Sequence, residues 1–166
     1  MPRLLTHYTV RVLRGEAVDV DCPVLIWSSA PAETSRVLLA TAPHQSAQRP
    51  RAGEPVVFEL RKGTDARNGF AMGITVGRTD SNDVWLDDES VSRFHAYFRQ
   101  TTHKGSPVWQ VVDAESMNGT FLNTFKLPTN KPESLRDGDT LRFGDVEVRF
   151  LLPEGFRKHL ELPKKA

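Results

Sequence analysis

Three short stretches of this 166-residue chain hold polar side chains of the kinds that bind an anion. The donors are two guanidinium groups, one hydroxyl and one side-chain amide, and they belong to Arg78, Arg93, Ser92 and Asn118. A guanidinium is a planar fork that bonds two oxygens of one anion, and a hydroxyl and loop amides can take a third oxygen. These residue types predict a phosphate site.

Each stretch falls where a predicted strand gives way to a loop. Short β-rich runs separated by turn residues recur at Val56–Arg61, Met72–Arg78, Asp83–Leu86, Phe94–Thr101, Val108–Asp113, Thr120–Leu122, Thr140–Phe143 and Val146–Leu152. Short strands at spacings of roughly 8–12 residues favour an all-β, antiparallel sandwich or barrel. Loops at one end of such a fold can converge on one spot, so the three stretches can form a single site.

The chain divides into three predicted parts. Residues 1–69 form a β-rich extension with strand candidates at 8–13, 23–27 and 36–41, and with a Pro-rich loop at 42–55. Residues 70–152 form the sandwich. Residues 153–166 hold a short helix and a basic tail, and the helix must dock to persist because it is too short to be stable alone. Its Phe156, His159 and Leu160 share one face.

Charge and composition exclude several classes of protein. Lys plus Arg is 22 and Asp plus Glu is 21, so the net charge of +1 provides no general field for nucleic acid or a membrane surface. Residues 70–152 contain nine basic and twelve acidic residues, a net charge of −3, so a phosphate site there must be a local cluster of donors.

Nothing in the sequence predicts a cofactor or a metal. The five histidines lack ligand spacing, and one cysteine, Cys22, forms no intrachain disulfide. Apolar runs fall far short of the roughly 18 residues of a spanning helix, and the first residues lack the apolar block of a secretion signal. We therefore expect a cytoplasmic protein.

In their order and spacing the three stretches, Gly77-Arg78-Thr79, Ser92-Arg93-Phe94-His95-Ala96 and Ser116-Met117-Asn118-Gly119-Thr120, resemble the forkhead-associated (FHA) domain. This family consists of phosphothreonine-binding β-sandwiches. The resemblance covers about half the chain, residues 69–152, and includes Val84-x-Leu86, Phe121-Leu122-Asn123, and Leu135-x-Asp137-Gly138-Asp139 followed by Phe143-Gly144.

The resemblance implies a role for each binding residue. Arg78 and Ser92 would bond phosphate oxygens, and Arg93 would either lie over the phosphothreonine backbone or reach the phosphate. Asn118 would hold the peptide main chain, for which an amide has both donor and acceptor. Asn123 would either contact the peptide or brace its own loop.

Four further residues would support the site. Gly77 and Gly119 would allow close approaches that a Cβ obstructs. His95 would tie neighbouring loops together through its ring nitrogens, and Thr120 would belong to the same scaffold. Ser92 and His95 are an odd number of residues apart at the start of a strand, which predicts opposite faces and argues against a nucleophilic pair.

The residues that set peptide specificity stay open in the sequence. The candidates are Ser90 and the loop Asn118–Asn130. Ser90 is uncharged, which gives no obvious demand for an acidic peptide residue, whereas Thr124-Phe125-Lys126 would favour either an apolar or an acidic group.

The sequence therefore predicts a non-enzymatic module that recognises a phosphothreonine written on a partner protein by a Ser/Thr kinase. The alternative is a phospho-independent scaffold that holds its partner with a sheet face or with residues 1–69. The sequence indicates neither the oligomeric state nor the identity of the partner.

Overall fold

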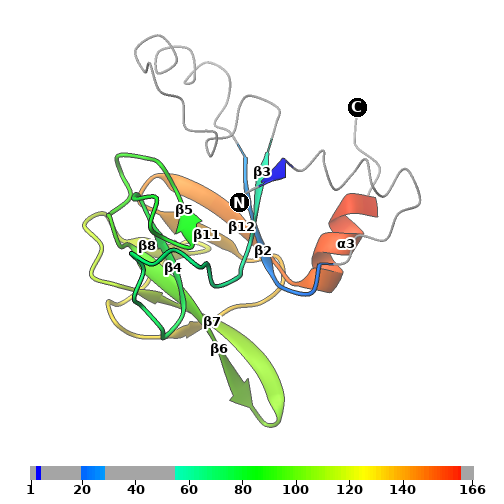
Figure 1. The fold of residues 1–166 in the computed structure, drawn as a ribbon. Helices are drawn as coiled ribbons and strands as arrows, with labels where there is room; N and C mark the ends of the chain where they lie inside the picture. The colour runs from blue at the N-terminus through cyan, green and yellow to red at the C-terminus, as the bar shows by residue number, and fades with distance from the viewer. Residues whose placement is uncertain (1–2, 5–19, 29–54, 162–166) are drawn as a thin grey trace.

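The computed structural model describes residues 3–4, 20–28 and 55–161. In these ranges two β-sheets face each other, and a helix lies at one end, beside β2 and β12 (Figure 1). No helix in them is long and apolar enough to cross a membrane. The strands predicted at 8–13 and 36–41, and the Pro-rich loop up to residue 54, lie outside the described residues.

The sheets contain seven and five strands. In the larger sheet the order is β1 (Arg3–Leu4), β3 (Val56–Glu59), β2 (Val24–Trp27), β12 (Val146–Leu151), β11 (Thr140–Phe143), β8 (Thr120–Leu122) and β9 (Phe125–Lys126). In the smaller sheet it is β10 (Glu133–Ser134), β7 (Ser106–Asp113), β6 (Ala96–His103), β4 (Ile74–Gly77) and β5 (Val84–Trp85). The predicted all-β sandwich is confirmed.

Pairing is antiparallel throughout these two sheets except between β4 and β5. That parallel pair, which the sequence pattern did not indicate, has Val76 opposite Val84 and Gly77 opposite Trp85. The pairing holds the loop of residues 78–83 against the end of β4. Arg78, the first residue of this loop, is therefore fixed at the edge of the sheet.

The main core lies between the sheets. Along β12, Val146, Val148 and Phe150 are buried while Glu147 and Arg149 are exposed, as the period-2 pattern predicts. Phe98 of β6 reaches across the core to Phe143 and Phe150, with ring centroids 6.2 and 6.4 Å apart. This packing fixes the two sheets, and hence their loops, relative to each other.

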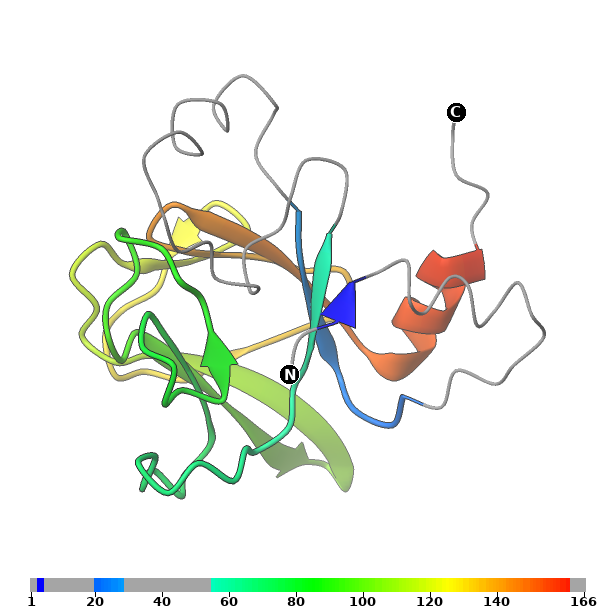
Figure 2. The ribbon, with the colours of Figure 1, turned by 45° about the horizontal axis from the view of Figure 1, so that its top comes forward.

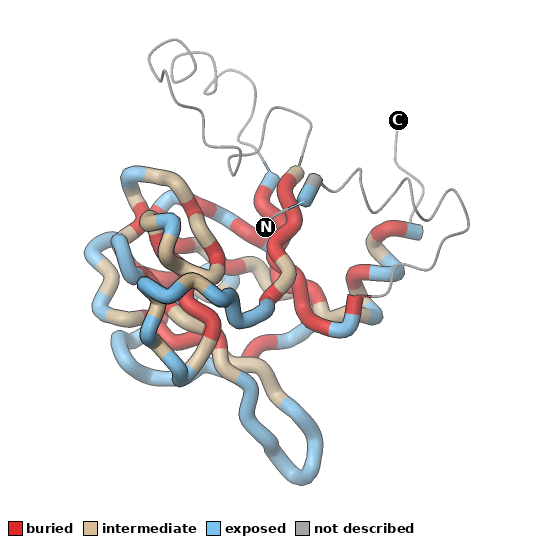
Figure 3. Tube along the Cα trace, viewed as in Figure 1, coloured by how far each residue is buried: buried red, intermediate tan, exposed pale blue. Residues whose placement is uncertain are grey.

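Strand β2 is buried on both faces. Leu25 and Trp27 belong to the core between the sheets, whereas Val24 and Ile26 belong to a second cluster on the outer face. Helix α3 (Pro153–Glu161) lies beside β2 at this end of the larger sheet (Figure 2), and it has buried residues on one side (Figure 3). Its Phe156 and Leu160 belong to the same second cluster as Val24 and Ile26. Double burial explains why β2 reads as a continuous apolar run instead of an alternating one.

The observed strands depart from the predicted runs in two ways. β1, β9 and β10 have no counterpart in the prediction, because each has two residues and depends on its neighbour more than on its own pattern. The hairpin of β6 and β7 extends further than predicted, and its exposed end projects from the sandwich (Figure 3).

We predict that Phe156→Ala destabilises the protein by about 3–5 kcal/mol, the usual cost of removing a buried Phe side chain. Phe156 is fully buried between α3 and the outer face of the larger sheet. Denaturant unfolding measures the effect, with Arg157→Ala at an exposed position of the same helix as the control. Equal unfolding free energies for the two variants would contradict a docked helix.

Candidate functional site

The structure brings the three polar stretches together at one end of the sandwich. The amide of Arg78, just after β4, donates to the carbonyl of Ser92 at 2.9 Å. The amide of Met117, in the loop between β7 and β8, donates to Ser92 Oγ at 3.0 Å. Ser92 therefore joins the Arg78 loop to the Asn118 loop.

His95 holds the same loops from beneath. Its ring is fully buried, Nδ1 accepts the amide hydrogen of Ser92 at 3.0 Å, and Nε2 donates to the carbonyl of Gly119 at 2.9 Å. Nδ1 must be unprotonated to accept, so the ring is the neutral Nε2–H tautomer. Burial lowers the pKa of His95, which favours that neutral form.

The hydroxyl of Ser92 does not face the ring of His95, as it would in a nucleophilic pair. The main-chain amide of Ser92 faces the ring, while its hydroxyl oxygen accepts from Met117. The ring instead packs edge-on against Phe143, with centroids 5.6 Å apart. The imidazole is thus a part of the scaffold.

Gly77 lies where no side chain fits. A Cβ on it would come 2.0 Å from the carbonyl oxygen of Arg93 and 2.6 Å from Nδ2 of Asn82. Gly119 has a φ of +86°, a conformation that favours glycine, and an added Cβ there would meet Lys126 Cε at 3.0 Å. Both glycines are required by the close packing of the loops.

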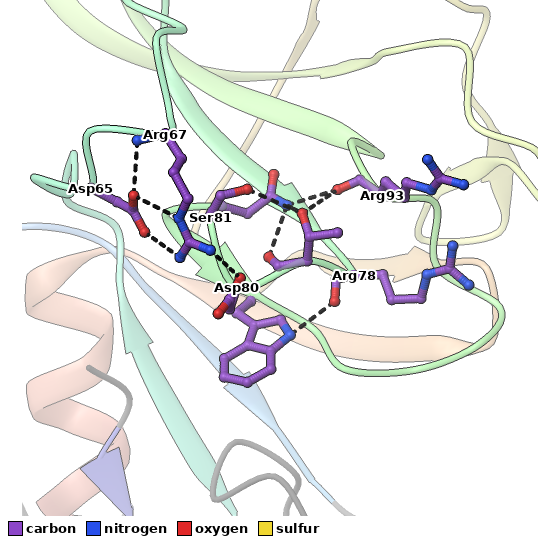
Figure 4. Close-up of polar contacts among 9 residues, drawn as sticks. Asp65, Arg67, Arg78, Asp80, Ser81 and Arg93 are labelled. Carbon is purple, nitrogen blue, oxygen red and sulfur yellow. Dashed lines mark hydrogen bonds and ion pairs between the residues drawn. The ribbon is translucent and has the colours of Figure 1, made fainter.

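The guanidinium groups of Arg78 and Arg93 extend to the same side of the molecule (Figure 4). Their main chains are fixed, because the carbonyl of Arg78 accepts from Trp85 Nε1 at 2.9 Å and that of Arg93 accepts from Asn82 Nδ2 at 2.7 Å. Within residues 3–4, 20–28 and 55–161, no hydrogen bond or ion pair engages either guanidinium. Two cations are therefore available to a ligand.

Ser92 and Asn118 keep hydrogen-bonding capacity beside these cations. Ser92 Oγ accepts one bond from Met117, so its own hydrogen is available to donate. Asn118 is exposed and donates from Nδ2 to the carbonyl of Ser90 at 2.8 Å. That bond orients the amide and leaves its Oδ1 and one N–H for a ligand.

Comparison with known proteins identifies the family. The family profile described as "FHA domain" matches residues 74–144. The oxoglutarate dehydrogenase inhibitor of Corynebacterium diphtheriae is 36% identical over 105 residues, which cover 61% of this chain and 68% of that protein. This chain belongs to the FHA domain family.

Two further similarities agree with that assignment. The glycogen accumulation regulator GarA of Mycolicibacterium smegmatis is 34% identical over 95 residues, which cover 55% of this chain and 56% of GarA. The yeast Dun1 FHA domain, solved with a doubly phosphorylated (pT) peptide derived from Rad53, superposes with a TM-score of 0.50 at 24% identity. That likeness covers 81% of this chain and 77% of the Dun1 chain, and it supports the fold.

Asn123, in the turn between β8 and β9, contacts the chain at the start of β11. Its Oδ1 accepts from the amide of Thr140 at 3.1 Å, and its Nδ2 donates to Asp139 Oδ1 at 3.3 Å. Of the two predicted roles for Asn123, bracing the loop is the one for which the structure shows contacts.

Ser90 is engaged in the same way. Its hydroxyl donates to Asp88 Oδ1 at 2.7 Å and accepts from the amide of Asp145 at 2.8 Å, and its carbonyl holds Asn118. Phe125, by contrast, is 62% exposed and Lys126 is also exposed. The choice between an apolar and an acidic peptide residue near Phe125 and Lys126 stays a prediction.

Asp113 is a site-supporting residue that the sequence analysis did not identify. It is 1% exposed and its carboxylate accepts from the hydroxyls of Thr120, at 2.6 Å, and Ser116. It thereby shapes the loop that carries Asn118 and gives Thr120 its supporting role. The available signal was an Asp three residues before a Ser at the end of a strand, a spacing that favours a side-chain-capped turn.

No group of three or more His, Cys, Asp or Glu side chains within the described residues is placed to hold a metal ion.

We predict that Gly77→Ala destabilises the FHA domain by about 1–3 kcal/mol, the cost of forcing an extra carbon into a packed site. Gly69→Ala is the matched control, because a Cβ at Gly69 meets nothing within 4 Å. Thermal or denaturant unfolding compares the two, and equal stabilities would contradict the tight packing of Gly77 against Arg93.

We predict that the folded FHA domain loses stability as pH falls below about 6.5. The unfolded His95 takes up a proton near its ordinary pKa of 6.5, whereas the pKa of the folded, buried ring is lowered, so acid favours the unfolded chain. The measurement is the unfolding free energy at pH 7.5 and pH 5.5, with NMR titration of the imidazole.

His159 requires a separate control for that measurement. Its pKa is also lowered, by burial and by the nearby charge of Arg149. The pH dependence must therefore persist in His159→Gln. A His95 imidazole that titrates at or above pH 6.5 in the folded protein would refute the scaffold role assigned to the neutral ring.

Proposed function

We propose that this FHA domain binds a phosphothreonine peptide and thereby recruits a protein that a Ser/Thr kinase has phosphorylated. The observation that carries the proposal is the pair of guanidinium groups on Arg78 and Arg93, which no described residue engages, next to the available hydroxyl of Ser92. The phosphate of the peptide would supply the anion that these donors lack.

The phosphate would be held chiefly by Arg78 and Ser92. Arg78 supplies charge-assisted bonds, and Ser92 donates a hydroxyl whose oxygen is already fixed by Met117. Residues 70–152 carry a net charge of −3, so attraction to phosphate comes from these local donors and not from a broad basic surface.

The peptide main chain would be held by Arg93 and Asn118. Asn118 is oriented by its bond to the carbonyl of Ser90 and has both a donor and an acceptor left over. A donor and an acceptor together match the alternating N–H and C=O groups of an extended peptide. Arg93 is exposed, and its guanidinium extends to the same side of the molecule as that of Arg78, within reach of the same ligand (Figure 4).

The names of the similar proteins support a regulatory role for this chain and not a catalytic one. Two relatives are named as an inhibitor of oxoglutarate dehydrogenase and as a regulator of glycogen accumulation, and the Dun1 FHA domain was solved with a phosphorylated peptide. From these similarities we propose a binding function for this chain. We place that function in the cytoplasm, since the single cysteine of the chain, Cys22, forms no intrachain disulfide.

Calorimetric titration with a degenerate phosphothreonine peptide library tests the proposal. Matching phosphoserine and unphosphorylated pools are the controls. Binding confined to the phosphothreonine pool is the expected result. Binding to none of the pools by a folded protein would favour the phospho-independent scaffold, whose partner would also stay bound after phosphatase treatment.

We predict that Arg78→Ala weakens binding of the best phosphothreonine peptide from that library by about tenfold to a hundredfold. A charge-assisted hydrogen bond contributes roughly 1.5–3 kcal/mol, and each 1.4 kcal/mol is a factor of ten. Lys104→Ala, at the exposed tip of the β6–β7 hairpin, is the control for lost positive charge. Unchanged affinity in Arg78→Ala would overturn the assignment.

A further inference from the structure

A groove of about 360 Å³ adjoins the proposed phosphate site. It lies between the segment of residues 67–70, the loop that follows Arg78, and the two residues that follow Ser92. Its lining includes Asn68, Gly69, Phe70, Thr79, Arg93 and Phe94. Arg93 thus belongs both to this groove and to the phosphopeptide site proposed above.

One wall of the groove is aromatic. Phe70 packs against Phe94 with ring centroids 5.2 Å apart, and against Tyr97 at 4.8 Å. Phe94 remains 37% exposed, which is unusual for a large apolar side chain in a packed cluster. The exposed part of this cluster offers an apolar surface that a ligand can cover.

The groove is formed before any ligand arrives. Asn68 Nδ2 donates to Thr75 Oγ1 at 2.8 Å, and the amide of Phe70 donates to Asn68 Oδ1 at 3.2 Å. On the opposite side Asn82 Nδ2 donates to the carbonyls of Thr79 and Arg93. These bonds fix both walls, so a bound ligand loses little binding free energy to ordering the groove.

The charged groups at the groove balance one another. The guanidinium of Arg67 is held between the carboxylates of Asp65, at 2.7 Å, and Asp80, at 3.1 Å (Figure 4). Arg93 adds a second guanidinium to the lining, so two positive charges stand against two negative ones. The charge at the groove therefore favours neither an acidic nor a basic side chain.

We propose that this groove is a specificity subsite for a large apolar side chain, aromatic, Leu or Met, of the bound phosphopeptide. The subsite rests on the proposed function, because the groove continues from the phosphate donors through Arg93 and through Thr79, the residue after Arg78. Because Arg93 lines both the groove and the phosphopeptide site, the residue that enters lies close in sequence to the phosphothreonine, and the three positions on either side of it are tested.

Two variants alter the groove in opposite ways. Phe94→Ala removes the exposed part of the aromatic wall. Gly69→Leu adds an apolar side chain to the lining of the groove, where its Cβ has nothing within 4 Å. Met72→Ala is the control, since Met72 is a 67% exposed apolar residue of the neighbouring segment that does not line the groove.

The test is a titration with phosphothreonine peptides that carry Phe, Ala or Asp in turn at each of the three positions on either side of the phosphothreonine. At one position the parent is expected to bind the Phe peptide about tenfold more tightly than the Ala peptide, and more tightly than the Asp peptide. Phe94→Ala and Gly69→Leu should reduce the Phe-to-Ala ratio to about one and leave the affinity for the Ala peptide unchanged. Met72→Ala should keep the parent's ratio.

The outcomes separate the subsite from the proposed function. An Ala-flanked phosphopeptide that binds, with no position at which Phe is preferred, would overturn the subsite alone. A Phe preference that survives in both groove variants would do the same. Failure of every phosphopeptide to bind would overturn both the subsite and the function on which it rests.

Discussion

The buried imidazole of His95 is the interaction on which the site depends. One ring nitrogen accepts from the amide of Ser92 and the other donates to the carbonyl of Gly119. One side chain thus sets the separation between the β5–β6 loop of the smaller sheet and the β7–β8 loop that connects the two sheets. Because the ring is fully buried and neutral, water cannot compete for these bonds and no counter-ion is required. Gly77 adds the second constraint, since its missing side chain lets the chain at Arg93 pass within contact distance.

This scaffold explains how a domain of net negative charge could present the proposed phosphate site. The carbonyls of Arg78, Ser92 and Arg93 each accept a hydrogen bond from another loop or strand, so their side chains start from fixed positions. Donors that are ordered in advance do not lose main-chain freedom when a ligand binds, and more of each bond's energy appears as affinity. The sandwich holds the loops in fixed positions, and the loops carry the side chains that would bind the ligand.

Sequence alone predicted the sandwich, most of its strands and the residues that meet at the site, because strand alternation and the order of the three stretches are local signals. It did not predict the roles of Asp113 and Asn82, whose bonds depend on loops meeting in space. It also could not place β2 in the middle of the larger sheet or pair β9 and β10, since these depend on partners distant in sequence. The groove beside Phe94 arises from three separate segments, and no one of them carries a pattern for it.

The central claim is that a phosphothreonine binds at the loops joined by His95. The most direct measurement is amide chemical-shift mapping by NMR of the whole chain, titrated with a phosphothreonine peptide pool and with the same pool after dephosphorylation. The account predicts saturable shifts at the amides of Arg78, Arg93, Met117 and Asn118 with the phosphorylated pool, and none after dephosphorylation. Shifts confined to another face of the sandwich, or shifts equal for both pools, would contradict it.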